Sequence, residues 1–204
     1  MERAFFSVKN GAKVNNYKGI EYFYNLYTEM EHIKRAGWVM RNVPAEVLES
    51  VSSHTLQVVM LSITFCHELN LDFDISRIAE MSLIHDIGEV LIGDVSEIDV
   101  NYEEKKKLEE NAVLRTLSTL SKETQDHYFS LWQEMEKRET LLSQFVYQVD
   151  KIDAVMKAKK YSIDYDMPEL FDEFYDYQLL KGTFDEGPLK EVFGSLRETK
   201  NIKN

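Results

Sequence analysis

A histidine and an aspartate stand side by side, as His85 and Asp86, at the end of an otherwise apolar stretch of the sequence. Burying charged groups is costly unless a partner compensates for the lost hydration. Two glycines and two further acids, Glu89 and Asp94, follow shortly afterwards. This pattern is typical of a helix that delivers ligands to a metal and then ends. Because a two-residue motif also occurs by chance, solvated side chains at the end of a helix are the alternative.

Two other helices contribute candidate ligands. His54 lies on the apolar face of a helix that is expected to begin at an N-cap, Ser52 or Ser53, and to run to about residue 69. A lone histidine on such a face is more often a core residue than a ligand. Asp150 and Asp153 interrupt the apolar stripe of a helix expected over about residues 140–161. An acid on a buried face needs a cation nearby, so one of the two is expected to partner a positive group.

Together these positions form the ordered set His…His-Asp…Asp. Two imidazoles and two carboxylates suit a divalent transition metal such as Mn, Co, Fe or Zn, with Mg a poorer match. A helical bundle can bring such side chains together in its interior. The candidate ligands are therefore His54, His85, Asp86 and one of Asp150 and Asp153.

Helical spacing of apolar residues recurs along nearly the whole chain, which has only three prolines and eight glycines. The sequence therefore predicts an all-α protein. Residues 1–16 are expected to form an N-terminal arm and residues 17–162 the helical core. Residues 163–204 begin with an acidic stretch rich in Tyr and Phe, and we expect them to add helices that pack on the core or on a second copy.

The composition limits the class of protein. A chain of 204 residues with 44% apolar residues can form one domain with a sizeable core. It has neither an apolar run of about 18 residues nor a signal-peptide core, so no membrane partner is expected. A single cysteine, Cys66, suits a reducing cytoplasm. The net charge of −12 argues against long nucleic acids but allows a small anionic substrate.

Two arginines and a tryptophan, Arg35, Trp38 and Arg41, fall close to the end of a helix expected over about residues 17–35. Arginine can bind a phosphate through two parallel hydrogen bonds, so both arginines are candidate phosphate ligands. A surface salt bridge is the alternative for each of them.

The combination of these segments resembles the HD-domain metal-dependent phosphohydrolases, and in its finer pattern their 5′-deoxynucleotidase branch. The resemblance covers about residues 22–161. It rests on residues 35–38 (RAGW), 49–54 (ESVSSH), 85–89 (HDIGE) with 93–94 (GD), and 145–151 (FVYQVDK). It implies an HD-domain helical bundle with an additional C-terminal helical segment.

The resemblance also implies a ligand set for one divalent metal. His54, His85, Asp86 and Asp150 would bind it, because Asp150 rather than Asp153 matches the acid of the family's last segment. Asp153 would then support the site from outside. No second histidine cluster is visible, so we expect a single metal.

Further roles follow from the same resemblance. Glu89 would act as an acid or base or orient a water, and Asp94 would contact the sugar or support the metal ligands. Arg35 would hold the 5′-phosphate, and Trp38 would crowd the sugar 2′ position and favour deoxyribose. Some members have the arginine directly before the tryptophan, whereas two residues intervene here. Arg41 therefore remains a rival phosphate ligand.

The expected reaction is hydrolysis of a deoxynucleoside 5′-monophosphate to deoxynucleoside and phosphate, with loose reading of the base, by a cytoplasmic homodimer. One alternative is an HD phosphohydrolase acting on another nucleotide, polyphosphate or cyclic. A triphosphate would need more cationic side chains near the pocket than the sequence motifs supply. The other alternative is a non-catalytic helical binding protein that keeps the metal, against which Glu89 and Asp94 argue.

Overall fold

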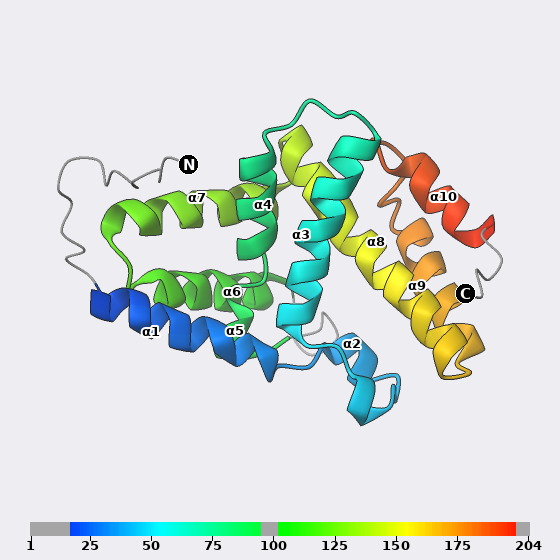
Figure 1. Ribbon diagram of the computed structural model, residues 1–204, viewed down its shortest axis with the longest axis horizontal. Helices are drawn as coiled ribbons and strands as arrows, with labels where there is room; N and C mark the ends of the chain where they lie inside the picture. The colour runs from blue at the N-terminus through cyan, green and yellow to red at the C-terminus, as the bar shows by residue number, and fades with distance from the viewer. Residues whose placement is uncertain (1–16, 95–101, 199–204) are drawn as a thin grey trace, which may run out of the picture.

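The regular structure of the chain is entirely helical. A computed structural model describes residues 17–94 and 102–198 (Figure 1). Within these ranges the only β-type contact is an isolated bridge between Lys34 and Ser50, so the all-α prediction is confirmed. The predicted N-terminal arm, residues 1–16, lies outside the described residues.

The helical elements of the described residues lie in a simple order along the chain. They are α1 (Tyr17–Thr28), η2 (Glu29–Glu31), α2 (Ala36–Val39), η3 (Ala45–Val47), α3 (Val51–Glu68), α4 (Ile75–Ile84), α5 (Glu89–Ile92), α6 (Tyr102–Leu117), α7 (Lys122–Lys137), α8 (Leu141–Asp164), α9 (Pro168–Leu180) and α10 (Lys190–Glu198).

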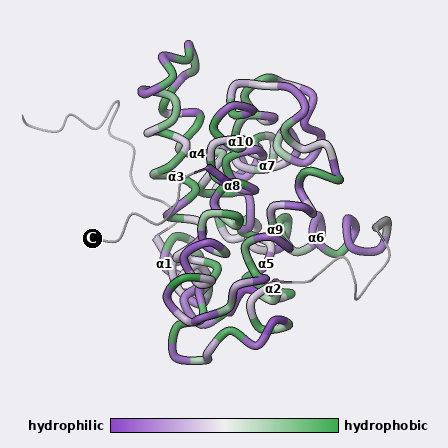
Figure 2. Tube along the Cα trace, turned by 90° about the vertical axis from the view of Figure 1, so that its right-hand side faces the viewer, coloured by the Kyte–Doolittle hydropathy of each residue, from purple (hydrophilic) through white to green (hydrophobic). Residues whose placement is uncertain are grey.

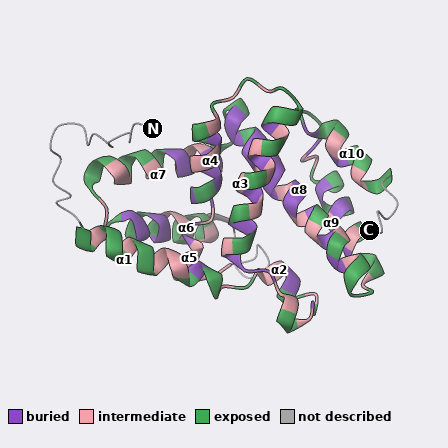
Figure 3. Ribbon diagram, in the orientation of Figure 1, coloured by how far each residue is buried: buried purple, intermediate pink, exposed green. Residues whose placement is uncertain are grey.

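Helices α3, α4 and α8 form the centre of the bundle. Helix α3 packs against both α4 and α8, α7 covers α4, and α9 lies along α8 (Figure 1). Buried positions are concentrated on these central helices (Figure 3). Val58, Ile78 and Phe145, one from each of them, are fully buried. Hydrophilic and hydrophobic residues alternate along the helices, as amphipathic helices around one core require (Figure 2).

Local hydrogen bonds set where the central helices begin. The hydroxyl of Ser50 accepts from the backbone N–H of Ser53, so the N-cap of α3 is Ser50, two or three residues earlier than the Ser52 or Ser53 expected from the sequence. The bridge to Lys34 explains the shift, since it holds Ser50 in an extended conformation just before the helix. At the start of α8, Thr140 and Ser143 form a reciprocal capping box.

Residues 164–198 include helices α9 and α10, which pack on the core. Tyr175 of α9 stacks on Phe193 of α10 at 4.3 Å between ring centroids, and Phe184 stacks on the same ring at 4.1 Å. The division into a helical core, residues 17–162, and a C-terminal helical appendage, residues 163–204, stays a prediction. None of the described helices is long and apolar enough to cross a membrane.

Candidate active site

Backbone pairing before α3 brings Arg35 beside the start of that helix. The Arg35 N–H donates to the Glu49 carbonyl at 3.1 Å, and the Val51 N–H donates to the Ile33 carbonyl at 2.9 Å. His54 then lies in the first turns of α3, with 1% of its surface exposed. The loop that carries Arg35 and the helix that carries His54 are therefore fastened together.

The His85-Asp86 pair lies where α4 ends. His85 is the C-cap residue of α4, and the turn after it leads into the short helix α5, which starts at Glu89. Gly88 sits in this turn against α6, where an added Cβ would lie 3.0 Å from a Val113 methyl and 3.3 Å from the Glu109 carbonyl. The glycine thus lets the turn pack closely on α6.

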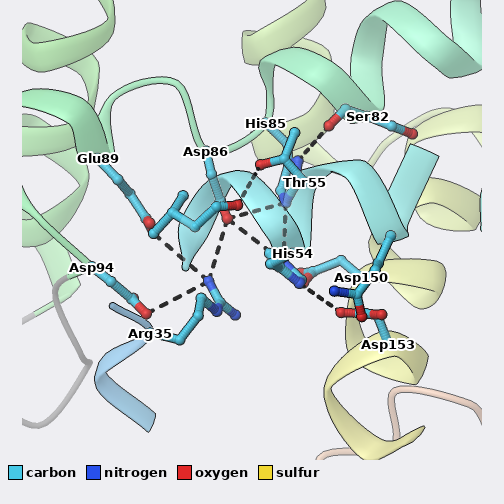
Figure 4. Close-up of polar contacts among 12 residues, drawn as sticks. Arg35, His54, Thr55, Ser82, His85, Asp86, Glu89, Asp94, Asp150 and Asp153 are labelled. Carbon is cyan, nitrogen blue, oxygen red and sulfur yellow. Dashed lines mark hydrogen bonds and ion pairs between the residues drawn. The ribbon is translucent and has the colours of Figure 1, made fainter. Parts of the chain in front are cut away.

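Two imidazoles and two carboxylates converge at one point between α3, α4 and α8 (Figure 4). The Nε2 atoms of His54 and His85 are 3.4 Å apart. Asp150 Oδ1 lies 3.1 Å from His54 Nε2, and Asp86 Oδ2 lies 3.2 Å from His85 Nε2. Side chains from three separate segments of the sequence therefore direct four possible metal-ligand atoms, two nitrogens and two oxygens, at a common centre.

The outward atoms of three of these residues are held by other groups. His54 Nδ1–H donates to Asp153 Oδ2 at 2.7 Å, and His85 Nδ1–H donates to the Ser82 carbonyl at 2.7 Å. Lys151 Nζ contacts Asp150 Oδ2 at 2.7 Å. Such outer partners fix the tautomer and orientation of metal-binding side chains. They leave the Nε2 atoms and one Asp150 oxygen directed at the centre.

The donor chemistry of this cluster fits a divalent metal. One nitrogen from each of His54 and His85 and one oxygen of Asp150 lie within 4.8 Å of one another, and all three residues are buried. Imidazole and carboxylate ligands in this ratio suit first-row transition metals.

Charge interactions shift the ionisation of the cluster. Burial and Arg35 lower the pKa of His54, but hydrogen bonds with Asp150 and Asp153 outweigh them and raise it to about 9. Burial raises the pKa of Asp86, yet His85 and Arg35 hold it below its usual range. Asp150 behaves likewise: burial raises its pKa, but Lys151 and His54 hold it well below the usual range. Both carboxylates are therefore kept ionised, as a metal requires.

Arg35 lies among three acids at the edge of this centre (Figure 4). Its Nη1 is 3.3 Å from Asp86 Oδ2, 3.6 Å from Asp94 Oδ2 and 4.0 Å from Glu89 Oε1. Asp94 also accepts from the Ala36 N–H at 2.8 Å, which ties the end of α5 to the loop of Arg35.

Glu89 differs from the other acids of the site. Burial, together with the charges of Asp86 and Asp94, raises its pKa well above the usual value, although Arg35 lowers it. Its Oε2 is buried and has no hydrogen-bond partner among the described residues. A carboxyl group in this environment keeps its proton to a higher pH than an exposed one, which suits a general acid.

One pocket of about 240 Å³ is lined by Arg35, Glu89 and three of the candidate metal ligands, His85, Asp86 and Asp150, and extends beyond them. Its acidic lining residues are Asp86, Glu89, Asp94, Glu109, Glu136 and Asp150, and its basic ones are Arg35, Lys105, Lys106, Arg138, Lys151 and Lys181. The pocket is therefore balanced in charge, although the whole chain carries −12. The expectation of few cationic side chains near the pocket is wrong, because α6, α8 and the ends of α7 and α9 supply them.

Two residues expected at the substrate do not line this pocket. Trp38 is 2% exposed, stacks on Phe174 at 4.5 Å, and donates its indole N–H to Glu49 Oε2 at 2.9 Å. Arg41 donates to Glu173 Oε1 at 3.0 Å, and its Cζ lies 4.6 Å from the centroid of the Phe174 ring. Of the two arginines, the structure brings only Arg35 to the acids of the pocket, and contact of Trp38 or Arg41 with a substrate stays a prediction.

Several lining residues were not found from the sequence. Lys151 could have been found, because it directly follows Asp150 in a recognised segment. Tyr147 lies in the same segment, whereas Arg138 and Tyr177 belong to none of the recognised segments. Arg138, Tyr147 and Tyr177 come from the end of α7, from α8 and from α9, and only the packing of these helices brings them to one wall.

The fold and the site define a class of protein. The HD domain family model matches residues 28–182, three quarters of the chain, so this protein belongs to the HD-domain family. The resemblance seen in the sequence is thereby confirmed.

Particular relatives are similar over most of the chain. The 5′-deoxynucleotidase HDDC2 of Bos taurus is 30% identical over 181 residues, which cover 88% of this chain and 84% of the relative. The human protein of the same name is 30% identical over 156 residues, or 76% of this chain and 74% of the relative.

Solved structures share the fold. A conserved hypothetical protein from Pyrococcus furiosus superposes with a TM-score of 0.68 at 25% identity, covering 87% of this chain and 98% of its own. An HD-domain phosphohydrolase from Listeria innocua gives a TM-score of 0.58 at 19% identity, covering 89% and 99%.

Proposed function

We propose that this protein hydrolyses deoxynucleoside 5′-monophosphates to deoxynucleosides and phosphate. The observation that carries the proposal is the convergence of His54, His85, Asp86 and Asp150 at a pocket that also contains Arg35 and Glu89. The relatives named 5′-deoxynucleotidase support the choice of substrate.

His54, His85, Asp86 and Asp150 would hold one divalent metal, which we propose to be Mn, Co, Fe or Zn rather than Mg. When bound there, the metal would lower the pKa of a water and polarise a phosphoryl oxygen.

Arg35 would bind the phosphate of the substrate and neutralise its charge. Its guanidinium is already placed beside the metal-binding centre, and Asp86 and Asp94 hold it there. Asp94 supports this position through the backbone of Ala36 rather than by a reaction of its own. A fixed cation beside the reacting group stabilises the transition state without reorganisation at the moment of reaction.

Glu89 would manage the proton. Its raised pKa favours the protonated carboxyl group, and its Oε1 lies 4.0 Å from Arg35 Nη1. It would donate this proton to the 5′-oxygen of the leaving deoxynucleoside, or orient the attacking water if it is ionised.

Trp38 would favour deoxyribose, and its buried position supports an indirect route. Its indole N–H holds Glu49, whose backbone carbonyl in turn holds the N–H of Arg35. Trp38→Phe keeps an aromatic ring on Phe174 but removes this donor. We expect the preference for dAMP over AMP to fall, as judged from kcat/KM for each; an unchanged ratio would contradict this role.

The proposal is tested by reloading metal-free protein with Mn, Co, Zn or Mg and screening deoxynucleoside and nucleoside mono-, di- and triphosphates. We expect phosphate release from the deoxynucleoside monophosphates with several bases and little from ribonucleotides. Preferred release from triphosphates would instead support the polyphosphate alternative, for which the basic lining of the pocket is suitable. Bound metal without turnover of any nucleotide would support a binding protein.

We further propose a cytoplasmic homodimer, on the basis of the family resemblance and the single cysteine. Light scattering of the purified protein tests the dimer. The charge of −12 supports the expectation that long nucleic acids are not partners.

A further inference from the structure

One residue at the end of α7 has an unusual backbone conformation for its type. The described residues with positive φ are Gly93, Gly182, Gly187, Asn42, Asn70, Asp166 and Arg138. Glycine adopts this conformation freely, and Asn and Asp tolerate it because their short polar side chains bond locally. Arginine has neither property, so Arg138, with φ 53° and ψ 32°, is the exception.

The backbone role of Arg138 does not require an arginine. Its N–H donates to the Glu134 carbonyl at 3.1 Å and closes α7, and its own carbonyl accepts from the Gln144 side chain at 3.0 Å. Glycine would make both bonds without strain, and it is the usual residue at such helix ends. Strained positions that persist tend to occur at functional sites, so a function of the Arg138 side chain would explain why arginine occupies this position.

The Arg138 side chain lines the same pocket as the metal-binding centre. Its Cζ lies 4.2 Å from the centroid of the Tyr147 ring. No described carboxylate forms an ion pair with it, and Tyr147 is the contact that holds the guanidinium group. The pocket wall thus contains a planar cation, the Arg138 guanidinium, that is backed by the phenol ring of Tyr147.

Contacts along α8 connect this cation to the metal-binding end. Lys151 Nζ is 2.7 Å from Asp150 Oδ2 and 5.1 Å from the Tyr147 centroid. Arg138 is therefore separated from the ligand Asp150 by two intervening side chains.

We propose that Arg138 binds substrate by stacking its guanidinium plane, backed by Tyr147, on the nucleobase. The inference rests on the proposed function, because a 5′-monophosphate held at Arg35 and the metal-binding centre leaves an uncharged nucleoside for the rest of the pocket. Arginine planes stack on any base, since every base has a π-face. Recognition of this kind accepts different bases, in agreement with the loose base reading expected from the sequence.

Arg138→Gly separates this role from a structural one. We expect the variant to melt at the same or a higher temperature, because glycine relieves the αL conformation. The ratio of kcat/KM for dAMP to kcat/KM for 2-deoxyribose 5-phosphate, which lacks the base, should fall about tenfold. An unchanged ratio, whether kcat/KM stays the same or falls equally for both substrates, would overturn the proposal.

Two further variants make the test specific. Asn70→Gly introduces the same backbone change at a remote αL position and should leave the ratio as in the wild type. Arg138→Lys keeps the charge but removes the planar group, so the ratio should fall nearly as far as in Arg138→Gly. Full retention by Arg138→Lys would replace stacking by a simple charge interaction and would overturn the proposal.

Binding distinguishes this inference from the proposed function. Calorimetric titration of the metal-free protein with dAMP should show weaker binding for Arg138→Gly than for the wild type. A wild type that binds dAMP through Arg138 but does not hydrolyse it would refute the proposed function alone. Equal affinity of both proteins would refute the role of Arg138.

Discussion

The two ends of the active-site pocket are built differently. At the metal-binding end, His54, His85 and Asp150 each have an outer partner within 2.7 Å that fixes their orientation. At the outer end, Lys106 and Arg138 are exposed, and the Arg138 side chain is held by a ring contact rather than by an ion pair.

This difference indicates a division of labour. Groups that act on developing charge must be held rigidly, because any reorganisation would add to the barrier. Groups that bind a variable base need no fixed pattern of hydrogen bonds, since every base has a π-face on which they can stack. The comparison predicts that substitutions at the metal-binding end reduce metal binding and kcat, whereas those at the outer end change substrate preference or stability.

The largest effect is expected for His85→Ala. Loss of one imidazole should release the metal, and kcat/KM for dAMP should fall by about 10³ or more, because the metal supplies several kcal/mol of transition-state stabilisation. Metal content by mass spectrometry and phosphate release are measured on the same sample. His127→Ala is the control, because His127 is exposed and pairs with Glu80 outside the pocket. Full activity after both the substitution and chelation would remove the metal from the proposed function.

The next effect separates the two arginines. Arg35→Ala should lower kcat/KM by about 10²–10³, the usual loss when one fixed donor to the reacting group is removed. Arg41→Ala should lower it by less than about threefold, because an exposed ion pair such as that with Glu173 contributes little. Steady-state kinetics with dAMP measure both. The reverse order would make Arg41 the phosphate ligand and would place the substrate outside this pocket.

A smaller effect is expected where an outer partner is removed. Asp153→Ala leaves the Nδ1–H of His54 without its acceptor, so the affinity for Mn or Co should fall about 10- to 100-fold. Asp153→Asn retains an acceptor oxygen and should lose less. Competition with a chelator of known affinity gives the dissociation constants. If all three proteins bound metal equally, the rigidity ascribed to the metal-binding end would have no support.

The smallest effect concerns stability at the outer end. Burial raises the pKa of Glu136; Arg138, Lys105 and Lys151 lower it, and Asp86 adds to the rise. Because the folded pKa is raised, the wild type loses stability as the pH increases from about 4.5 through the folded pKa. Glu136→Gln does not titrate at this position.

The melting temperatures of wild type and Glu136→Gln should therefore differ little at pH 4, and the difference should grow as the pH rises through the folded pKa and then level off, with the variant the more stable. Calorimetry at constant ionic strength measures this difference. Glu139→Gln, at an exposed position close in sequence, is the matched control. A difference that is constant with pH would show that the ionisation of Glu136 is not the cause.

Much of the fold followed from local patterns. Apolar residues at helical spacing predicted α3, α4 and α8, because amphipathic helices must place one face on the core. The order of His54, His85 and Asp86 along the sequence predicted the candidate metal-binding centre, since the residue types and the helical period are both visible in the sequence. The start of α3 was misplaced because the bridge between Lys34 and Ser50 joins residues that no local pattern connects.

Tertiary structure decided what the residue types left open. Asp150 and Asp153 are three residues apart on one helix face, and only the position of α3 directs Asp150 to the Nε2 side of His54 and Asp153 to its Nδ1 side. Arg138 likewise reaches the pocket only through the packing of the helices, because its neighbours in the sequence give no sign of a binding site. Helical periodicity determines which face of a helix is buried, but the meeting of side chains from different helices depends on how those helices pack, and that is a property of the whole chain.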